Sequence, residues 1–384
     1  MFERLDLWEY HIQDATARML VDSSTLMDSG KLLSDEEKAR RERLRIFQTG
    51  IVEYFWSPDG SALLFPLNGD LWLYRLDTDE PLVQLTRSDT FETDIQFSPD
   101  GQHIAFVREQ NLFVIELAGG TETQLTSDGS GTLSNGLPEF IAQEEMHRYE
   151  GYWWSPDSTR IAYLQVDEAP VEISQRYEID ADQFGVYDQR YPFAGTPNAE
   201  VRLGVIELSD TPDTSWIPLQ RDPETYLPRI NWFADSRHLA VQIQSRDQQN
   251  LLLCRVACDG SSQQTLLTET SATWINLHNN FRSLAATDEF IWASERTGYL
   301  HLYRVANDGS SITPLTEGDW VVTDIRGIDE QTGKIWFEGF ADTPLEKHLT
   351  SVYHRSAWIG NAAENHRGRW FSYDIPEPRQ TVFH

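Results

Sequence analysis

Lysine is scarce in this chain of 384 residues, and most of its basic residues are arginines. Lysine occurs only at Lys31, Lys38, Lys334 and Lys347. The 31 basic residues are outnumbered by 61 acidic ones, which gives a formal net charge of −30. This charge repels the phosphates of nucleic acids and of anionic membranes. We therefore expect no nucleic-acid partner, and we expect either amine-bearing ligands or an acidic surface that only maintains solubility.

Cysteine is also scarce, since the chain has only Cys254 and Cys258. A strand that turns into a hairpin holds these two residues, and they cannot easily meet there to form a disulfide. Neither a Cys-x-x-Cys pair nor a His-Glu-x-x-His motif is present. We therefore predict no disulfide framework, no metal site and no cofactor.

Long hydrophobic runs are missing as well. No stretch of about 18 apolar residues occurs, so we expect no transmembrane helix and no membrane span. The first residues do not combine a basic segment with an apolar one, which means that no signal peptide is expected in this chain.

Aromatic residues and repeated turns, in contrast, are abundant. An aromatic residue followed by Ser-Pro-Asp and a short apolar strand occurs three times, and a degenerate copy occurs once. These copies begin at Trp56, Phe97, Trp154 and Phe233. Because proline presets φ and glycine accepts a positive φ, the Pro-Asp-Gly sequences predict hairpin turns.

A second repeated unit follows the first. It is an alternating apolar strand, a turn and a closing Leu-Thr pair, with copies that begin at Leu71, Leu112, Leu251 and Leu300. Together the two units supply four strands over about 40 residues, as in a propeller blade. We therefore predict an all-β fold over residues 1–384: a β-propeller of seven to eight four-stranded blades, with incomplete terminal blades and short helical insertions. A stacked β-sandwich is the alternative.

Both ends of the chain have the pattern of half blades. Leu7–Val21 is similar to the second half of a blade, and Arg369–Phe383 to the first half. Two half blades can pair and close a propeller, or they can mark the missing ends of a longer protein.

Three segments interrupt the repeat. Leu33–Ile46 is predicted to be a helix, with Ser34 and Glu37 as a capping box and with arginines after its acidic residues. Gly129–Gly151 contains two adjacent glutamates and is expected to include a short helix. Asp167–Arg202 lies between the middle strands of one blade, and its length indicates a binding or interface element.

Glu144 and Glu145, here called the acid pair, are the strongest candidates for a binding site, because no strand repeat requires them. An ammonium group offers three donors and one positive charge, so two converging carboxylates can bind it through charge-assisted hydrogen bonds. The alternative is an exposed acidic stretch of a helix. His147 shows no metal-ligand spacing and is expected to be a surface residue.

A substrate carbonyl beside such an amine would favour a planar cationic donor, which arginine provides better than lysine. Arg108, at the end of a predicted strand, is a candidate, and an ion pair with a surface acid is the alternative. Tyr152 is expected to face the binding cavity. Trp154 matches Trp56 in the repeat and is expected to lie in a blade core.

The order of these segments resembles the propeller domain of the dipeptidyl peptidase IV family of serine peptidases, especially its bacterial members. The resemblance covers essentially the whole chain. It is most specific at Gln143–Met146 with Tyr152–Pro156, and it continues at Gln189–Gly195 and Gly298–Tyr303. The Arg-rich helix before the first blade also matches. It supplies a substrate-binding arginine in some relatives, which makes Arg43 a further candidate.

The resemblance implies an enzyme that removes dipeptides after Pro or Ala from the amino termini of peptides. Glu144 and Glu145 match the family's double-glutamate motif, which binds the free amine of the substrate. The implied partners are the peptide amino terminus, a C-terminal α/β-hydrolase domain of the same enzyme and, as a further possibility, a second copy in a homodimer. The compartment stays unknown from the sequence, with the periplasm and the cytoplasm of a bacterium both open.

One family feature is missing from this sequence. The family's nucleophile lies in a Gly-x-Ser-x-Gly elbow, which does not occur here, and no alternating strand–helix region is available for a hydrolase sheet. We therefore expect no catalytic residue and no Ser-Asp-His triad in this chain, and no hydrolysis by it alone. Two alternatives remain open: a non-catalytic propeller that binds peptides or proteins, and a fragment used as an assembly surface.

Overall fold

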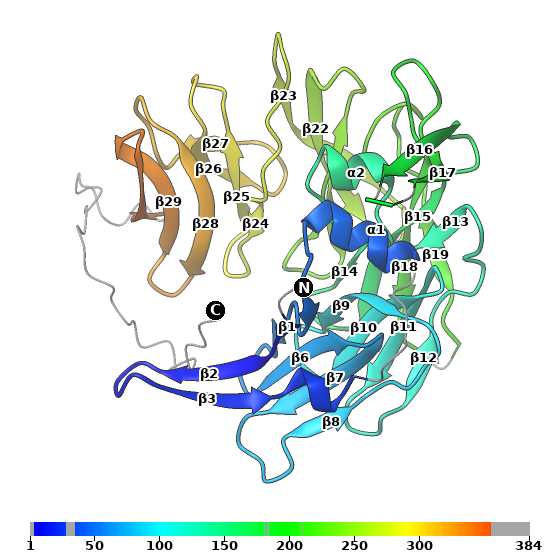
Figure 1. The fold of residues 1–384 in the computed structure, drawn as a ribbon. Coiled ribbons are helices and arrows are strands. Elements are labelled where there is room, and N and C mark those ends of the chain that lie inside the picture. Colours follow the sequence, from blue (N-terminus) through cyan, green and yellow to red (C-terminus); the bar gives the residue numbers. More distant parts are fainter. Residues whose placement is uncertain (1–3, 28–34, 180, 183, 210, 355–384) are drawn as a thin grey trace. The chain divides into compact units, whose positions relative to one another are not determined.

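A computed structural model describes residues 4–27, 35–179, 181–182, 184–209 and 211–354 (Figure 1). These residues belong to two compact units, one within Met1–Thr214 and the other within Ser215–Phe371. Nearly all regular structure in both units is antiparallel β-sheet. Four sheets have four strands each, joined in chain order, as the repeats predict for propeller blades. The prediction of an all-β fold of propeller type is confirmed.

The first unit contains three blades. The first blade is β5 (Phe55–Trp56), β6 (Ala62–Leu67), β7 (Asp70–Arg75) and β8 (Leu82–Gln84). The second blade is β9 (Glu92–Phe97), β10 (His103–Arg108), β11 (Asn111–Glu116) and β12 (Glu122–Gln124). The third has five strands: β13 (Leu133–Asn135), β14 (Tyr152–Trp154), β15 (Arg160–Asp167), β18 (Glu200–Glu207) and β19 (Thr214–Ile217), the last of which crosses the boundary to the second unit.

Short elements precede the first blade. They are β1 (Arg4–Leu5), β2 (Leu7–His11), β3 (Thr16–Val21), the 3-10 helix η1 (Ser23–Thr25) and β4 (Thr49–Gly50). β2 and β3 form the two-stranded half blade that the sequence predicted, and β1 pairs in parallel with β4. The half blade predicted for Arg369–Phe383 lies outside the described residues.

The described residues of the second unit, which end at position 354, form two four-stranded blades and one sheet of three strands. The first blade is β20 (Ile230–Trp232), β21 (His238–Gln244), β22 (Asn250–Ala257) and β23 (Gln263–Thr270). The next is β24 (Arg282–Ser283), β25 (Glu289–Ser294), β26 (His301–Ala306) and β27 (Ile312–Pro314). The last sheet is β28 (Val322–Asp329), β29 (Lys334–Thr343) and β30 (Glu346–Tyr353). Both cysteines of this unit are free thiols.

Apolar residues repeated along the central strands form the cores between adjacent blades. Leu64 and Leu73 of the first blade pack with Ile104, Phe106 and Phe113 of the second, and all five are buried. The rings of Phe106 and Phe113 stack with centroids 5.6 Å apart. Full burial of a side chain of this size contributes roughly 1.5–3 kcal/mol. The repeated apolar pattern is therefore what packs one blade against the next.

The Ser-Pro-Asp turns explain why the first repeat is so regular. In the first copy, the Asp59 carboxylate accepts hydrogen bonds from the Ser57 hydroxyl at 2.7 Å and from the Ser61 amide at 3.0 Å. These hydrogen bonds lower the pKa of Asp59 to about 2. Gly60 follows with φ +71°, a conformation that glycine adopts without steric cost. Each element of the motif therefore has a role in closing the hairpin.

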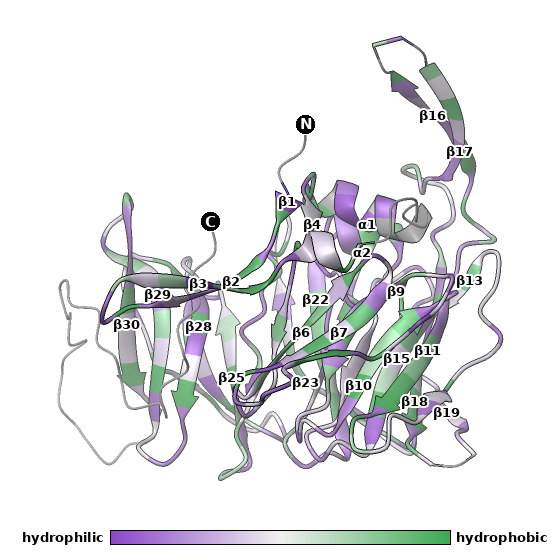
Figure 2. Cartoon of the chain, turned by 60° about the horizontal axis from the view of Figure 1, so that its bottom comes forward, coloured by the Kyte–Doolittle hydropathy of each residue, from purple (hydrophilic) through white to green (hydrophobic). Residues whose placement is uncertain are grey.

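The insertions gather at one end of the strands of the first unit. Helix α1 (Asp35–Leu44) and helix α2 (Phe140–Glu144) lie side by side there, and the hairpin of β16 (Ile173–Ile179) and β17 (Phe184–Arg190) projects beyond them (Figures 1 and 2). The predicted helices and the long insertion in the third blade are thus observed. The capping box cannot be described, because Ser34 and the Glu37 side chain lie outside the described residues. No helix in the described part of the chain is both long and apolar enough to cross a membrane.

Candidate functional site

The acid pair lies at the carboxyl end of α2. Glu144 is the last residue of the helix and Glu145 is its C-cap, and both side chains are exposed. Ala142 and Met146 of the same segment are buried, with 0% and 3% exposure. The short helix therefore buries its apolar face and presents both carboxylates to solvent.

A buried arginine closes the loop that follows α2. The guanidinium of Arg148 is 2.6 Å from the carboxylate of Glu139, the N-cap of the helix, and it also donates to the Glu150 carbonyl at 2.8 Å. The Arg148 backbone amide donates to the Ala142 carbonyl at 2.9 Å. The guanidinium lies 5.9 Å from the centre of the Trp153 ring. Arg148 thereby joins the beginning of the helix to the end of the loop.

Tyr152 does not face a cavity, so this prediction is wrong. The side chain is fully buried, and its hydroxyl donates to the backbone carbonyls of Asp94 and, at 2.9 Å, Ala105. Tyr152 and Trp154 are two residues apart in one strand and therefore lie on the same face. The second blade covers this face at both positions, since the Trp154 ring lies 6.2 Å from the His103 ring. Trp154 is 8% exposed, so its predicted core position is confirmed.

Arg108 is bound to acidic neighbours. It forms ion pairs with Glu92, at 3.3 Å, and with Glu122, and its guanidinium lies 4.2 Å from the centre of the Phe113 ring. Burial raises the pKa of Glu92 to about 7, although the Ser88 hydroxyl and Arg108 both favour the ionised form. Arg108 is thus paired with acidic side chains, which is the alternative to substrate binding that we considered from the sequence.

Helix α1 connects to its neighbours by ion pairs. Arg40 is 2.5 Å from Glu53, and Glu42 receives two hydrogen bonds of 2.8 Å from Arg176 of the projecting hairpin. The backbone of Arg43 belongs to α1, but its side chain lies outside the described ones. Its predicted role in substrate binding stays a prediction.

Three residues important to this region were not predicted from the sequence: Asp94, Arg148 and Glu150. Arg148 and Glu150 both follow the acid pair, in an irregular segment where their charges gave no periodic signal. Asp94 lies inside a strand with an apparently ordinary alternation. The bulge at Asp94 is visible only in the register of β9 against β10, so the sequence carried no signal for it.

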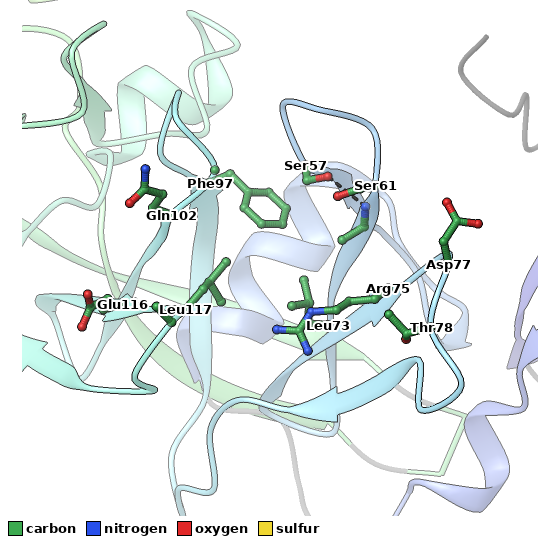
Figure 3. A pocket seen from close by; sticks show the side chains of 13 residues that line it. Ser57, Ser61, Leu73, Arg75, Asp77, Thr78, Phe97, Gln102, Glu116 and Leu117 are labelled. Carbon is green, nitrogen blue, oxygen red and sulfur yellow. Dashed lines mark hydrogen bonds between the residues drawn. The ribbon is translucent and has the colours of Figure 1, made fainter. Parts of the chain in front are cut away.

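No cluster of three or more metal-ligating side chains occurs in the described residues. One cavity, of about 410 Å³, lies between the first two blades (Figure 3). Its lining includes Ala62, Arg75, Phe97 and Leu117, which lie at the end of the strands opposite to Arg108. The cavity is therefore separate from the acid pair, and none of the predicted site residues lines it.

Comparison with known proteins identifies the family. Residues 57–357 match the family model described as the dipeptidyl peptidase IV N-terminal region. The chain is 30% identical to a probable dipeptidyl peptidase 4 of Emericella nidulans, over 79% of this chain and 43% of that protein. It is 27% identical to dipeptidyl peptidase 8 of Mus musculus, over 83% of this chain and 46% of that protein.

A solved structure shows the same fold. The crystal structure of Porphyromonas gingivalis dipeptidyl peptidase 4 matches with a TM-score of 0.71 and 24% identity, over 79% of this chain and 45% of that one. The chain thus spans less than half the length of these relatives. Because the family model covers most of the sequence, this chain belongs to the family of the dipeptidyl peptidase IV N-terminal region.

Proposed function

We propose that this chain is the substrate-recognition part of a serine dipeptidyl peptidase, in which Glu144 and Glu145 anchor the free amino terminus of a peptide. The observation that carries the proposal is the position of the acid pair: both residues end a short helix among the insertions of the first unit, in a chain of the dipeptidyl peptidase IV N-terminal family. Arg148 joins Glu139 and Glu150 on either side of the acid pair in the chain, which holds the segment that carries the pair. Two carboxylates suit an ammonium group with its three donors.

An amine held at a fixed distance from the nucleophile would also explain why the product is a dipeptide. A nucleophile at a constant distance from the acid pair reaches only the peptide bond two residues from the amino terminus. We assign that nucleophile to an α/β-hydrolase domain of the same enzyme, with cleavage after Pro or Ala. The matching relatives, which are named dipeptidyl peptidases and are more than twice as long as the matched region, support this assignment.

Binding of a short peptide tests the proposal directly. The probe is alanyl-prolyl-alanine, compared with its N-acetylated form by isothermal titration calorimetry at pH 7. Loss of one charge-assisted hydrogen bond costs about 1.5–3 kcal/mol, so Glu144→Gln and Glu145→Gln should each weaken binding roughly 10- to 100-fold. Glu109→Gln, an exposed glutamate in the turn between β10 and β11, is the control. Equal affinity of both variants and wild type for the free peptide would refute the role of the acid pair.

The second candidate is a propeller that binds peptides or proteins without catalysis. The large exposed apolar side chains of the β16–β17 hairpin favour binding to another protein. Affinity for peptides that is independent of a free amine would support this candidate over the first.

The same hairpin supports the proposal of a homodimer. Tyr177 pairs with Val186, and Ile179 pairs with Phe184, so these four exposed side chains lie on one face. The opposite face carries Arg176, which binds α1. A contiguous apolar face on an otherwise strongly acidic protein is typical of an interface, and a second copy can supply the same apolar face in return.

A further inference from the structure

Asp94 lies at a β-bulge in the second blade. The register of β9 against β10 shifts between Thr93 and Gln96, so Asp94 and Ile95 together oppose one residue of β10. Asp94 has φ +50°, in the left-handed region that non-glycine residues rarely adopt. Bulges of this kind redirect a side chain out of the regular alternation of a strand. Here the redirected carboxylate meets the segment that follows α2.

Both polar groups of Asp94 hold this segment. Its carboxylate accepts a hydrogen bond from the Gly151 amide at 3.0 Å, and its backbone carbonyl accepts one from the Tyr152 hydroxyl. Gln96 supports the arrangement, since its side-chain amide lies 3.3 Å both from the Asp94 carboxylate and from the Tyr152 carbonyl. Two residues of β9 thus fix Gly151 and Tyr152 together.

Gly151 packs closely against the backbone of the third blade. A Cβ at this position would lie 2.4 Å from the Gly136 backbone, and the Gly151 carbonyl already accepts the Leu164 amide at 2.9 Å. Gly151 therefore anchors the carboxyl end of the segment that contains the acid pair, Arg148 and Glu150.

We propose that Asp94 is a positioning residue for the acid pair: through Gly151 it sets the place of the loop that carries Glu144 and Glu145. This inference rests on the proposed function, because it assumes that the pair binds an amine. The carboxylate of Asp94 binds the Gly151 amide more strongly when it is ionised, since a charge-assisted hydrogen bond is stronger than a neutral one. The position of the loop therefore depends on the charge of Asp94.

Several charged and titratable groups face Asp94. Glu150 approaches from the loop itself, Tyr152 from β14, and Arg40 from α1, where Arg40 is also paired with Glu53. Burial, followed by the charge of Glu150, raises the pKa of Asp94 to about 7, against the opposing effects of the Gly151 amide, Gln96 and Arg40. Asp94 accordingly changes charge near neutral pH, whereas an exposed aspartate does so near pH 4.

The test is the pH dependence of peptide binding. Affinity of the chain for alanyl-prolyl-alanine is measured from pH 5.5 to pH 8.5 in wild type, Asp94→Asn and Glu92→Gln. The peptide amine titrates near pH 8 in every case, so the ratio of two affinities at each pH removes its contribution. We expect wild type to exceed Asp94→Asn by about fivefold or more at pH 8.5 and by less than twofold at pH 5.5. Glu92→Gln is the matched control, because it is the other carboxylate of β9 with a pKa of about 7.

A constant ratio of wild type to Asp94→Asn across the pH range would overturn the proposal, as would a step of equal size in Glu92→Gln. Hydrogen exchange of residues 146–152 in wild type gives a second measurement that needs no variant. Protection of this segment, corrected for intrinsic exchange rates, should fall as the pH is lowered from 8 to 6, and unchanged protection would contradict the role of Asp94. Amine-independent binding in wild type would instead refute the proposed function of the acid pair.

Discussion

The guanidinium of Arg148 donates a 2.6 Å hydrogen bond to the carboxylate of Glu139, and both side chains are buried. The two residues are nine positions apart and enclose the whole of α2 with the acid pair. A helix of five residues is too short to be stable alone. This ion pair therefore stabilises a helix that would be too short to form alone.

Removal of one partner of this pair should be costly. Arg148→Met leaves the Glu139 carboxylate buried without its counterion, so we expect a loss of about 3–5 kcal/mol in the free energy of unfolding. The double variant Arg148→Met/Glu139→Gln should lose less, because no uncompensated charge remains. Urea denaturation followed by tryptophan fluorescence compares them. A double variant at least as unstable as the single one would be inconsistent with this explanation.

Gly151→Ala tests the close contact with Gly136. The added Cβ would lie 2.4 Å from a backbone carbon, so the segment must move, and we expect a destabilisation of about 1–3 kcal/mol together with weaker peptide binding. The matched control is Gly327→Ala, where a Cβ would lie 3.8 Å from its nearest neighbour, an ordinary contact. Thermal unfolding of the two variants measures the difference. Similar melting temperatures would argue against a steric requirement for glycine at position 151.

Glu92 makes stability depend on pH in a defined direction. Its pKa is about 7 in the folded chain against 4.5 in the unfolded one. The folded state therefore holds the proton more tightly, so this contribution to stability is complete below pH 4.5 and is lost as the pH rises through 7. Relative to Glu92→Gln, wild type should lose roughly 3 kcal/mol between pH 4 and pH 8. Chemical denaturation of both proteins at the two pH values measures this, and a constant difference would contradict it.

The hairpin prediction concerns self-association. If Tyr177, Ile179, Phe184 and Val186 contact a second copy, Ile179→Asp places a charge in that interface and should convert the dimer to a monomer. Ser174→Asp, on the opposite face of the same strand, should leave the dimer intact. Sedimentation velocity gives the mass of each protein. A wild-type monomer, or dissociation by both substitutions, would count against an interface on the apolar face.

The sequence predicted the blades well because their information is local. Each Ser-Pro-Asp turn closes through atoms a few residues apart: in the first copy, Asp59 accepts from Ser57 and Ser61, and Ser57 accepts from the Ala62 amide. The apolar alternation of the following strand can also be recognised without a distant partner. The repeat also identified Glu144 and Glu145 as residues outside the blades, and both are exposed at the end of α2. Their role in amine binding stays a prediction.

Contacts between segments far apart in the sequence were not predictable in this way. Tyr152 was expected to face the binding cavity, although alternation places it on the same face as Trp154. The pattern alone does not show what covers that face. Its hydroxyl reaches carbonyls of the second blade, which lie 47 and 58 residues earlier in the chain. Asp94 escaped notice for the same reason, because its bulge becomes meaningful only when Gly151 is seen beside it.

The aspartates of the Ser-Pro-Asp turns limit how this protein can adapt its surface. Asp59, Asp100 and Asp157 contribute to the large negative charge, yet each accepts the hydroxyl of the serine two residues before it, and each has a lowered pKa. The ionised carboxylates accept the hydrogen bonds that close the turns, and they stay ionised at a lower pH than an ordinary aspartate does. A less acidic variant of the protein, natural or engineered, must therefore lose acidic residues at other positions. The turn aspartates should stay acidic when the rest of the surface changes.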